Sequence, residues 1–123
     1  MALITINKDV CIGRFQMLSD AAKACYFTLL LFADRSGLCD RMLALRFCSE
    51  QADTALHELA DNGFVLELDG VVAIRHWFLH DKNRMSSRSE TVFTAAYNML
   101  TLKDRIYEMK KVKDAGSNTE SEK

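Results

Sequence analysis

Proline is absent from this sequence, and only five of its 123 residues are glycine. Helix ends must therefore be set by glycine and by N-cap side chains. Five scattered glycines cannot form a loop that cradles phosphate, and the patterns G-x-S-x-G, G-x-x-x-x-G-K-[ST], G-x-G-x-x-G and H-E-x-x-H are missing. We therefore expect a protein that is not an enzyme and that holds no cofactor.

The sequence also has no excess of charge of either sign. Lysine and arginine together number 16, and aspartate and glutamate number 17, which gives a formal net charge of −1. This balance excludes the overall basicity of a histone or a ribosomal protein. If the chain binds nucleic acid, the distribution of its charges must provide the attraction.

No apolar run is long enough to cross a bilayer. The longest covers only residues 26–33, is interrupted by Thr28 and is followed by Asp34. The first residues also lack the basic and apolar regions of a secretory signal. We therefore expect a cytoplasmic protein with no membrane partner. Its four cysteines are widely spaced and form no C-x-x-C pair, so they should be reduced thiols, three of them packed in the core.

The first part of the chain has signals for one strand and one helix. Residues 3–6 alternate well enough to predict a short strand. Ser19 is a good N-cap, and apolar residues then recur at helical spacing as far as residue 32 or 33. Gly37 follows closely and ends this helix.

Two further helices are predicted next to each other. Asp40 can cap a short helix over residues 41–47, and Ser49 can cap the following one. In the latter, apolar residues follow the i, i+3, i+4, i+7, i+8 rule up to Asn62-Gly63, a pair that supplies a left-handed C-terminal cap.

Two β-rich runs, residues 64–68 and 71–77, flank Asp69-Gly70 and predict a hairpin whose turn residues both have positive φ. In this hairpin Leu68 lies opposite Val71, with residues 66 and 65 opposite 73 and 74. Both of its faces are apolar, so further elements must cover it. We expect this cover to come from two helices over residues 91–100, where Phe93, Ala96, Tyr97 and Leu100 form a stripe, and over residues 101–112.

The order of three helices followed by a hairpin predicts a winged helix-turn-helix domain, mainly α-helical with a small β-hairpin. It would occupy residues 1–113, with an added N-terminal strand and one or two extra C-terminal helices. The third helix would be the recognition helix, and the hairpin would be the wing. Residues 114–123 lack large apolar side chains and are expected to form a disordered tail or a linker.

Three blocks of sequence within about residues 10–100 resemble the N-terminal domain of phage replisome organisers, which are replication initiators. The blocks are Phe15-x-x-Leu18-Ser19-x-x-Ala22-x-x-Cys25-Tyr26-Phe27-x-Leu29 with Ala33-Asp34-x-x-Gly37; Leu59-x-x-x-Gly63-Phe64-Val65 with Val71-Val72-x-Ile74-x-His76-Trp77; and Asn83-Arg84-x-x-x-Arg88-x-x-Thr91. The resemblance implies a winged-helix domain that binds double-stranded origin DNA in a bacterial host cell. It also implies a further region that recruits the replicative helicase or its loader, so this chain would be an excised domain or a short stand-alone relative.

DNA affinity comes mainly from cations that neutralise phosphates, and the predicted recognition helix has none. It carries four acids instead, Glu50, Asp53, Glu58 and Asp61. Positive and polar side chains follow the hairpin, and we expect DNA contacts from Arg75, Lys82, Asn83, Arg84 and Arg88, with Ser86, Ser87 and Thr91 as further phosphate donors. The alternative is that these charges only form a solvated surface.

The acidic helix face also has two interpretations. It is either an ordinary exposed face or a surface for a basic protein partner, as in a phage inhibitor that occupies a host nucleic-acid-handling complex. A homodimer through the apolar hairpin and the last helices is a further possibility. His76 and His80 are not expected to bind a metal, because their spacing of four in a strand does not bring them to one side.

Overall fold

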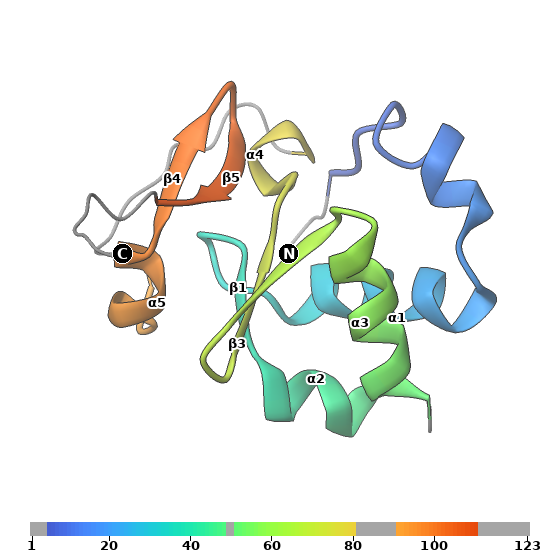
Figure 1. Ribbon diagram of the computed structural model, residues 1–123, viewed down its shortest axis with the longest axis horizontal. Coiled ribbons are helices and arrows are strands. Elements are labelled where there is room, and N and C mark those ends of the chain that lie inside the picture. The colour runs from blue at the N-terminus through green and yellow to red at the C-terminus, as the bar shows by residue number, and fades with distance from the viewer. Residues whose placement is uncertain (1–4, 49–50, 81–90, 111–123) are drawn as a thin grey trace, which may run out of the picture.

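The computed structural model describes residues 5–48, 51–80 and 91–110. Its elements form a mixed α/β fold with two small antiparallel sheets. In chain order they are η1 (Gly13–Met17), α1 (Asp20–Phe32), β1 (Leu38–Asp40), α2 (Arg41–Phe47), α3 (Ala52–Asp61), β2 (Val65–Leu68), β3 (Val71–Ile74), α4 (Trp77–His80), α5 (Thr94–Asn98), β4 (Leu100–Lys103) and β5 (Ile106–Met109). Figure 1 shows α1, α2 and α3 on one side of the central strands and α5, β4 and β5 on the other.

The first two helices begin and end as the sequence predicts. The Ser19 hydroxyl accepts a hydrogen bond from the Ala22 amide at 3.1 Å, which caps α1. The Asp40 carboxylate accepts one from the Met42 amide at 3.2 Å and caps α2. Each bond satisfies an amide that the helix itself leaves unpaired, so the local N-cap signals were sufficient.

The third helix is shorter than predicted. It begins at Ala52, with Gln51 as an N-cap whose side chain makes no capping bond, whereas Ser49 lies outside the described residues. The predicted end is confirmed, because α3 ends at Asp61 and Gly63 has a φ of 80°. The face of α3 that carries the small and aliphatic residues is buried, as the periodicity predicts.

The hairpin of β2 and β3 has the predicted register, with Leu68 opposite Val71 and Val65 opposite Ile74. Its turn differs from the prediction, since Gly70 has a φ of 78° but Asp69 does not have a positive φ. Strand β1 was not predicted. It pairs with the free edge of β3, Leu38 lying opposite Ala73, which gives the sheet order β1-β3-β2.

The alternation of side chains along these strands divides the apolar residues between two cores, so each face of the sheet is covered. Cys39, Val65, Val72 and Ile74 face the first core, which α1, α2 and α3 complete. Leu38, Leu68, Val71 and Ala73 face a second core that includes Phe78, Ala96, Leu100 and Tyr107. The expectation that later elements cover the hairpin is therefore confirmed.

Strand β3 ends at Ile74, three residues earlier than predicted, and Trp77 begins the short helix α4. The indole Nε1 donates a hydrogen bond to the Arg35 carbonyl oxygen at 2.9 Å. Its ring lies so close to Gly37 that a Cβ on this glycine would be 2.5 Å from the Trp77 Cγ. Gly37 also has a φ of 82°, so both space and backbone conformation require glycine here.

The predicted helix over residues 101–112 is wrong, because β4 and β5 form a second hairpin there. Its turn residues, Asp104 and Arg105, have φ values of 53° and 67°, as in a type I′ turn. Tyr107 holds this hairpin on the molecule. Its hydroxyl donates to the Ser36 carbonyl oxygen at 2.7 Å, and its ring packs edge-on against Phe78 at 5.6 Å between ring centroids.

The helix predicted over residues 91–100 is also shorter, since α5 spans Thr94–Asn98 and Leu100 belongs to β4. The predicted apolar stripe still packs against the second core. Residues 5 and 6 form no strand, and the rest of the predicted N-terminal strand and the tail at 114–123 lie outside the described residues. Within the described ranges, no helix has the length and apolar character needed to cross a bilayer.

Candidate functional site

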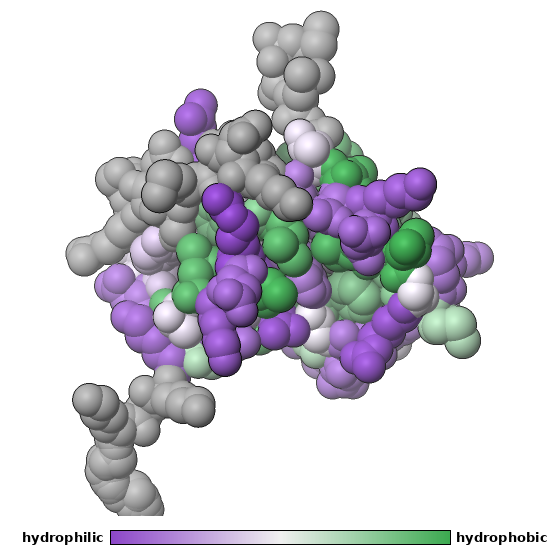
Figure 2. Space-filling model, turned by 90° about the horizontal axis from the view of Figure 1, so that it is seen from above, coloured by the Kyte–Doolittle hydropathy of each residue, from purple (hydrophilic) through white to green (hydrophobic). Residues whose placement is uncertain are grey.

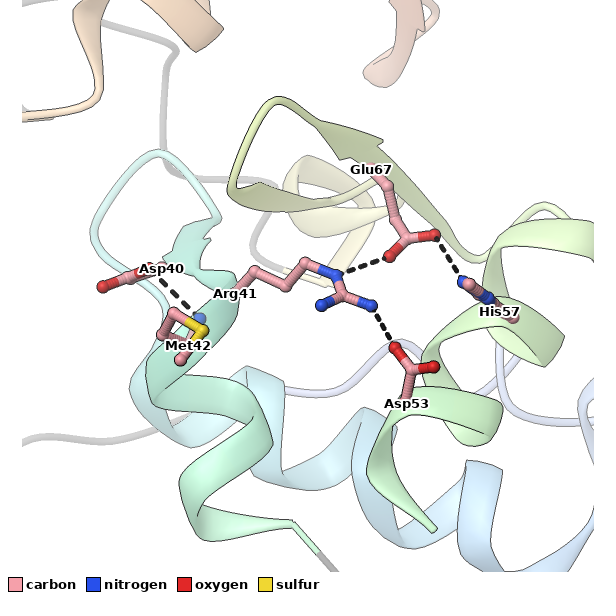
Figure 3. A network of polar contacts seen from close by, with 6 residues as sticks. All are labelled: Asp40, Arg41, Met42, Asp53, His57 and Glu67. Carbon is pink, nitrogen blue, oxygen red and sulfur yellow. Dashed lines mark hydrogen bonds and ion pairs between the residues drawn. The ribbon is translucent and has the colours of Figure 1, made fainter.

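The exposed face of α3 carries carboxylates, and Arg41, a cation that contacts this face, is already paired with Asp53 and Glu67. Arg41, the first residue of α2, lies between Glu67 of β2 and Asp53 of α3 (Figure 3). Its Nε donates to Glu67 Oε1 at 3.0 Å, and its Nη2 donates to Asp53 Oδ1. These bonds, first the one to Glu67 and then the one to Asp53, raise the pKa of Arg41.

Glu58, a second acid of this face, closes the start of α1. Its two carboxylate oxygens accept hydrogen bonds from the Ser19 amide at 2.8 Å and from the Ser19 hydroxyl at 2.7 Å. The bond from the amide is the main reason why the pKa of Glu58 is lowered. This carboxylate therefore completes a capping arrangement between two helices that are distant in sequence.

The remaining acids extend the same surface. Asp61 is exposed at the end of α3, and Asp69 is exposed at the turn of the first hairpin. Glu50, the fourth acid expected here, lies outside the described residues. The α3 and hairpin surface thus carries five described carboxylates, those of Asp53, Glu58, Asp61, Glu67 and Asp69. DNA phosphates would be repelled by this surface, so it does not suit insertion of α3 into a major groove.

Of the five predicted DNA-binding residues, only Arg75 belongs to the described part of the chain. Its Nε donates to the Tyr107 carbonyl oxygen at 3.1 Å, and its Nη1 donates to the Gly63 carbonyl oxygen at 2.9 Å. The guanidinium therefore joins the end of α3 to the second hairpin, a role that the sequence did not indicate. Lys82, Asn83, Arg84 and Arg88 lie outside the described residues.

Thr91 was expected to donate to phosphate, and the structure contradicts this expectation. Its hydroxyl donates to Asp34 Oδ2 at 2.5 Å, and only 7% of the residue is exposed. Asp34 Oδ1 also accepts hydrogen bonds from the amides of Ser36 and Leu38 at 2.8 and 3.1 Å. The Ala33-Asp34-x-x-Gly37 block is thus a turn that Asp34 organises, and Thr91 fastens the later chain to it.

His80 is buried and acts as a neutral hydrogen-bonding residue. Its Nδ1 accepts a hydrogen bond from the Asn7 amide at 2.8 Å, so its proton is on Nε2, which donates to the Tyr26 hydroxyl oxygen at 2.7 Å. Burial is the main cause that lowers the pKa of His80 to about 4, with a smaller effect from His76. Both ring nitrogens are therefore already used within the chain.

His76 precedes α4 and does not lie in a strand, so the geometric reason given above against a shared metal site was wrong. The His80 amide donates to the His76 carbonyl oxygen at 3.1 Å, which places the two residues on one helical turn. Burial, and then the charge of Arg75, lowers the pKa of His76. No three potential metal ligands gather among the residues that the structure describes.

The four cysteines carry no disulfide. Cys25 and Cys39 are buried, whereas Cys11 and Cys48 are partly exposed. The thiol of Cys48 lies 3.2 Å from the Cys25 sulfur. Burial raises the pKa of Cys25, and it raises the pKa of Cys39 to about 11, so both remain protonated and poorly nucleophilic near neutral pH.

The chain matches no protein-family model, no curated protein and no solved structure. Its function must therefore be inferred from its own residues.

Proposed function

We propose that this chain is a non-catalytic, winged-helix domain that binds double-stranded DNA in the initiation of phage or mobile-element replication. The observation that carries the proposal is topological. The order α1-β1-α2-α3-β2-β3 with the sheet order β1-β3-β2 agrees with the arrangement of helices and wing expected for a winged helix. Two of the three sequence blocks that resemble replisome organisers fall on α1, the end of α3 and the first hairpin, whereas most of the third block lies outside the described residues.

In this proposal the DNA is not contacted through the α3 face. Arg41 is held between two carboxylates there, and the hairpin turn adds Asp69, so neither α3 nor the hairpin turn offers positive charge. The phosphate contacts are assigned to Lys82, Arg84 and Arg88, with Asn83 as a neutral donor. Arg75 directly follows β3 and precedes this segment in the chain, and it bonds to the carbonyl oxygens of Gly63 and Tyr107.

A salt titration tests this function. The affinity for a fluorescent duplex of about 20 base pairs should fall between about 50 and about 300 mM salt, because binding releases counterions. The triple variant Lys82→Ala, Arg84→Ala and Arg88→Ala should reduce the slope of log K against log salt by about 3. The matched control, Lys8→Ala with Arg14→Ala and Lys23→Ala, removes the same charge elsewhere and should keep the wild-type slope. Undetectable binding of the wild type at low salt would refute the proposal.

The carboxylates around α3 favour a second candidate, an interaction module for a basic protein that handles nucleic acid. Such a module could also recruit a helicase loader or inhibit a host complex. Asp53→Lys with Asp61→Lys reverses the charge while sparing Glu58, which caps α1. Capture of a partner from bacterial lysate should then be lost, with Lys8→Glu and Lys23→Glu as the control for charge reversal elsewhere. Unchanged capture would reject this surface as the interface.

A further inference from the structure

Helix α1 is apolar on its outer face as well as on its buried face. Ala24, Phe27 and Leu31 follow each other at spacings of three and four, so they form one stripe along the helix. Phe27 is 40% exposed and Leu31 is 67% exposed. A helix of a monomeric domain ordinarily presents polar residues on the side away from the core.

The apolar surface continues beyond the stripe. Phe32 at the end of α1 stacks on Phe47 of α2 with ring centroids 4.8 Å apart, and the two are 41% and 52% exposed. Phe27 also contacts Phe15 of η1, which leads to Met17, 85% exposed. Figure 2 shows that the face seen from above also exposes hydrophobic side chains, in places between hydrophilic ones.

The size of this surface, defined as Met17, Phe27, Leu31, Phe32 and Phe47, suits a protein interface. Their exposed fractions together correspond to roughly 500 Å² of apolar area, the size of the largest apolar patch on a typical monomer, and such a patch often marks a binding surface. One side of a standard interface buries about 800 Å², of which somewhat more than half is apolar. The area available therefore matches what one partner contributes.

We propose that this surface binds a second copy of the chain, through α1 helices packed antiparallel about a two-fold axis near Phe27 and Thr28. In this register the small Ala24 of each copy faces the large Leu31 of the other, so the stripe is complementary to itself. Residues 24–32 include no charged side chain, so no like charges meet at the axis. The dimer surface suggested by the sequence combined the apolar hairpin with the last helices, and both faces of that hairpin are instead covered within one chain.

Sedimentation velocity over a range of concentrations up to about 200 µM tests this dimer. The wild type should dimerise with a Kd on the order of 10 µM. Leu31→Glu should weaken the dimer about 30-fold or more, because it places a charge at the centre of the interface. Val92→Glu is the matched control, because Val92 does not belong to this surface and is 86% exposed. The Val92→Glu variant should dimerise like the wild type. Circular dichroism establishes that each variant is folded.

A charge pair tests the register. Ala24→Lys alone should also weaken the dimer, whereas Ala24→Lys combined with Leu31→Glu should restore part of the affinity across the axis. Residues 24 and 31 are two turns apart within one helix, so this rescue would come from the second copy. A wild type that is monomeric at about 200 µM, or a Leu31→Glu variant that dimerises as tightly as the wild type, would overturn the proposal. Absence of rescue in a folded double variant would overturn the antiparallel arrangement.

Discussion

The two faces of the central sheet are covered in different ways. On the first face, α1, α2 and α3 each bury an apolar side, and side-chain caps close α1 and α2. On the second face, short elements are fastened by single side chains that bond to backbone carbonyls. Tyr107 reaches the carbonyl oxygen of Ser36, Arg75 reaches that of Gly63, and Trp77 reaches that of Arg35. The first face is therefore built from local sequence signals, whereas the second depends on a few long-range contacts.

Tyr107→Ala should have the largest effect on the stability of the second face. It removes the ring packed on Phe78 and the bond to Ser36, and we expect the free energy of unfolding to fall by about 3 to 5 kcal/mol. Tyr107→Phe keeps the ring and should cost only about 1 kcal/mol. Urea unfolding measures both changes. Leu56→Ala, which truncates a buried side chain of the first core, is measured beside them for comparison. An unchanged urea midpoint for Tyr107→Ala would mean that the second hairpin is not an anchored part of the fold.

Acidification should destabilise the hydrogen bond by which His80 of α4 contacts Tyr26 of α1. The pKa of His80 in the folded chain is about 4 and its ordinary value is 6.5, so the unfolded chain binds the proton more readily. The free energy of unfolding should therefore fall as the pH drops from 6.5 towards 4, by about 3 kcal/mol, and this contribution should then level off. Urea unfolding at several pH values measures the slope.

The variant His80→Gln should remove most of this slope between pH 6.5 and pH 4, although it also lowers stability at neutral pH. His57→Gln removes an exposed histidine of α3 and is the matched control for the loss of an imidazole. Equal slopes in the wild type and in His80→Gln would contradict the assignment of the pH dependence to His80.

Gly37→Ala should cost about 2 to 3 kcal/mol, because the new Cβ strains a left-handed backbone and displaces the Trp77 ring. Gly70→Ala has a similar φ of 78° but meets no atom within 4 Å, so only the backbone strain of about 1 kcal/mol remains. Thermal unfolding of the two variants separates these contributions. Equal losses would show that the Trp77 ring does not press on Gly37.

Glu58→Ala should have the smallest effect, a loss of about 1 kcal/mol, because the Ser19 amide loses its acceptor. Asp61→Ala removes the same charge from an exposed residue of α3 and should change the free energy of unfolding by less than about 0.5 kcal/mol. The stabilising bond of Glu58 should also weaken as the pH falls through its lowered pKa. Identical stabilities of the two variants in urea would contradict the capping role of Glu58.

Much of the first face could be predicted from sequence because its determinants are local. Ser19 and Asp40 cap the helices that follow them, and Asp69-Gly70 sets the register of the first hairpin. The second hairpin was predicted as a helix because Thr101-x-x-Asp104 resembles a capping box, a pattern that favours the start of a helix. The interactions that favour strands there are made by Tyr107, whose hydroxyl bonds to a residue 71 positions away.

The candidate site was predictable only in its composition. The acids of α3 are visible in the sequence, but the pairing of Arg41 with Glu67 joins residues 26 positions apart. The bonds of Arg75 and Thr91 could not be predicted from the sequence. Arg75 bonds to backbone carbonyl groups, which every residue has, and Thr91 bonds to a single distant aspartate, Asp34. These contacts give both residues partners within the fold. Thr91 is buried and its hydroxyl is used, so its predicted role as a phosphate donor is wrong, whereas a DNA contact by Arg75 stays a prediction.

A titration of ¹⁵N-labelled protein with duplex DNA, followed by ¹H–¹⁵N NMR, locates the proposed DNA contact on the chain. We predict that the largest shifts fall on amides of residues 81–90 and of their neighbours around Arg75. The amides of Asp53, His57 and Asp61 on the exposed face of α3 should stay nearly unchanged. Shifts concentrated on that face of α3, with residues 81–90 unaffected, would contradict the account.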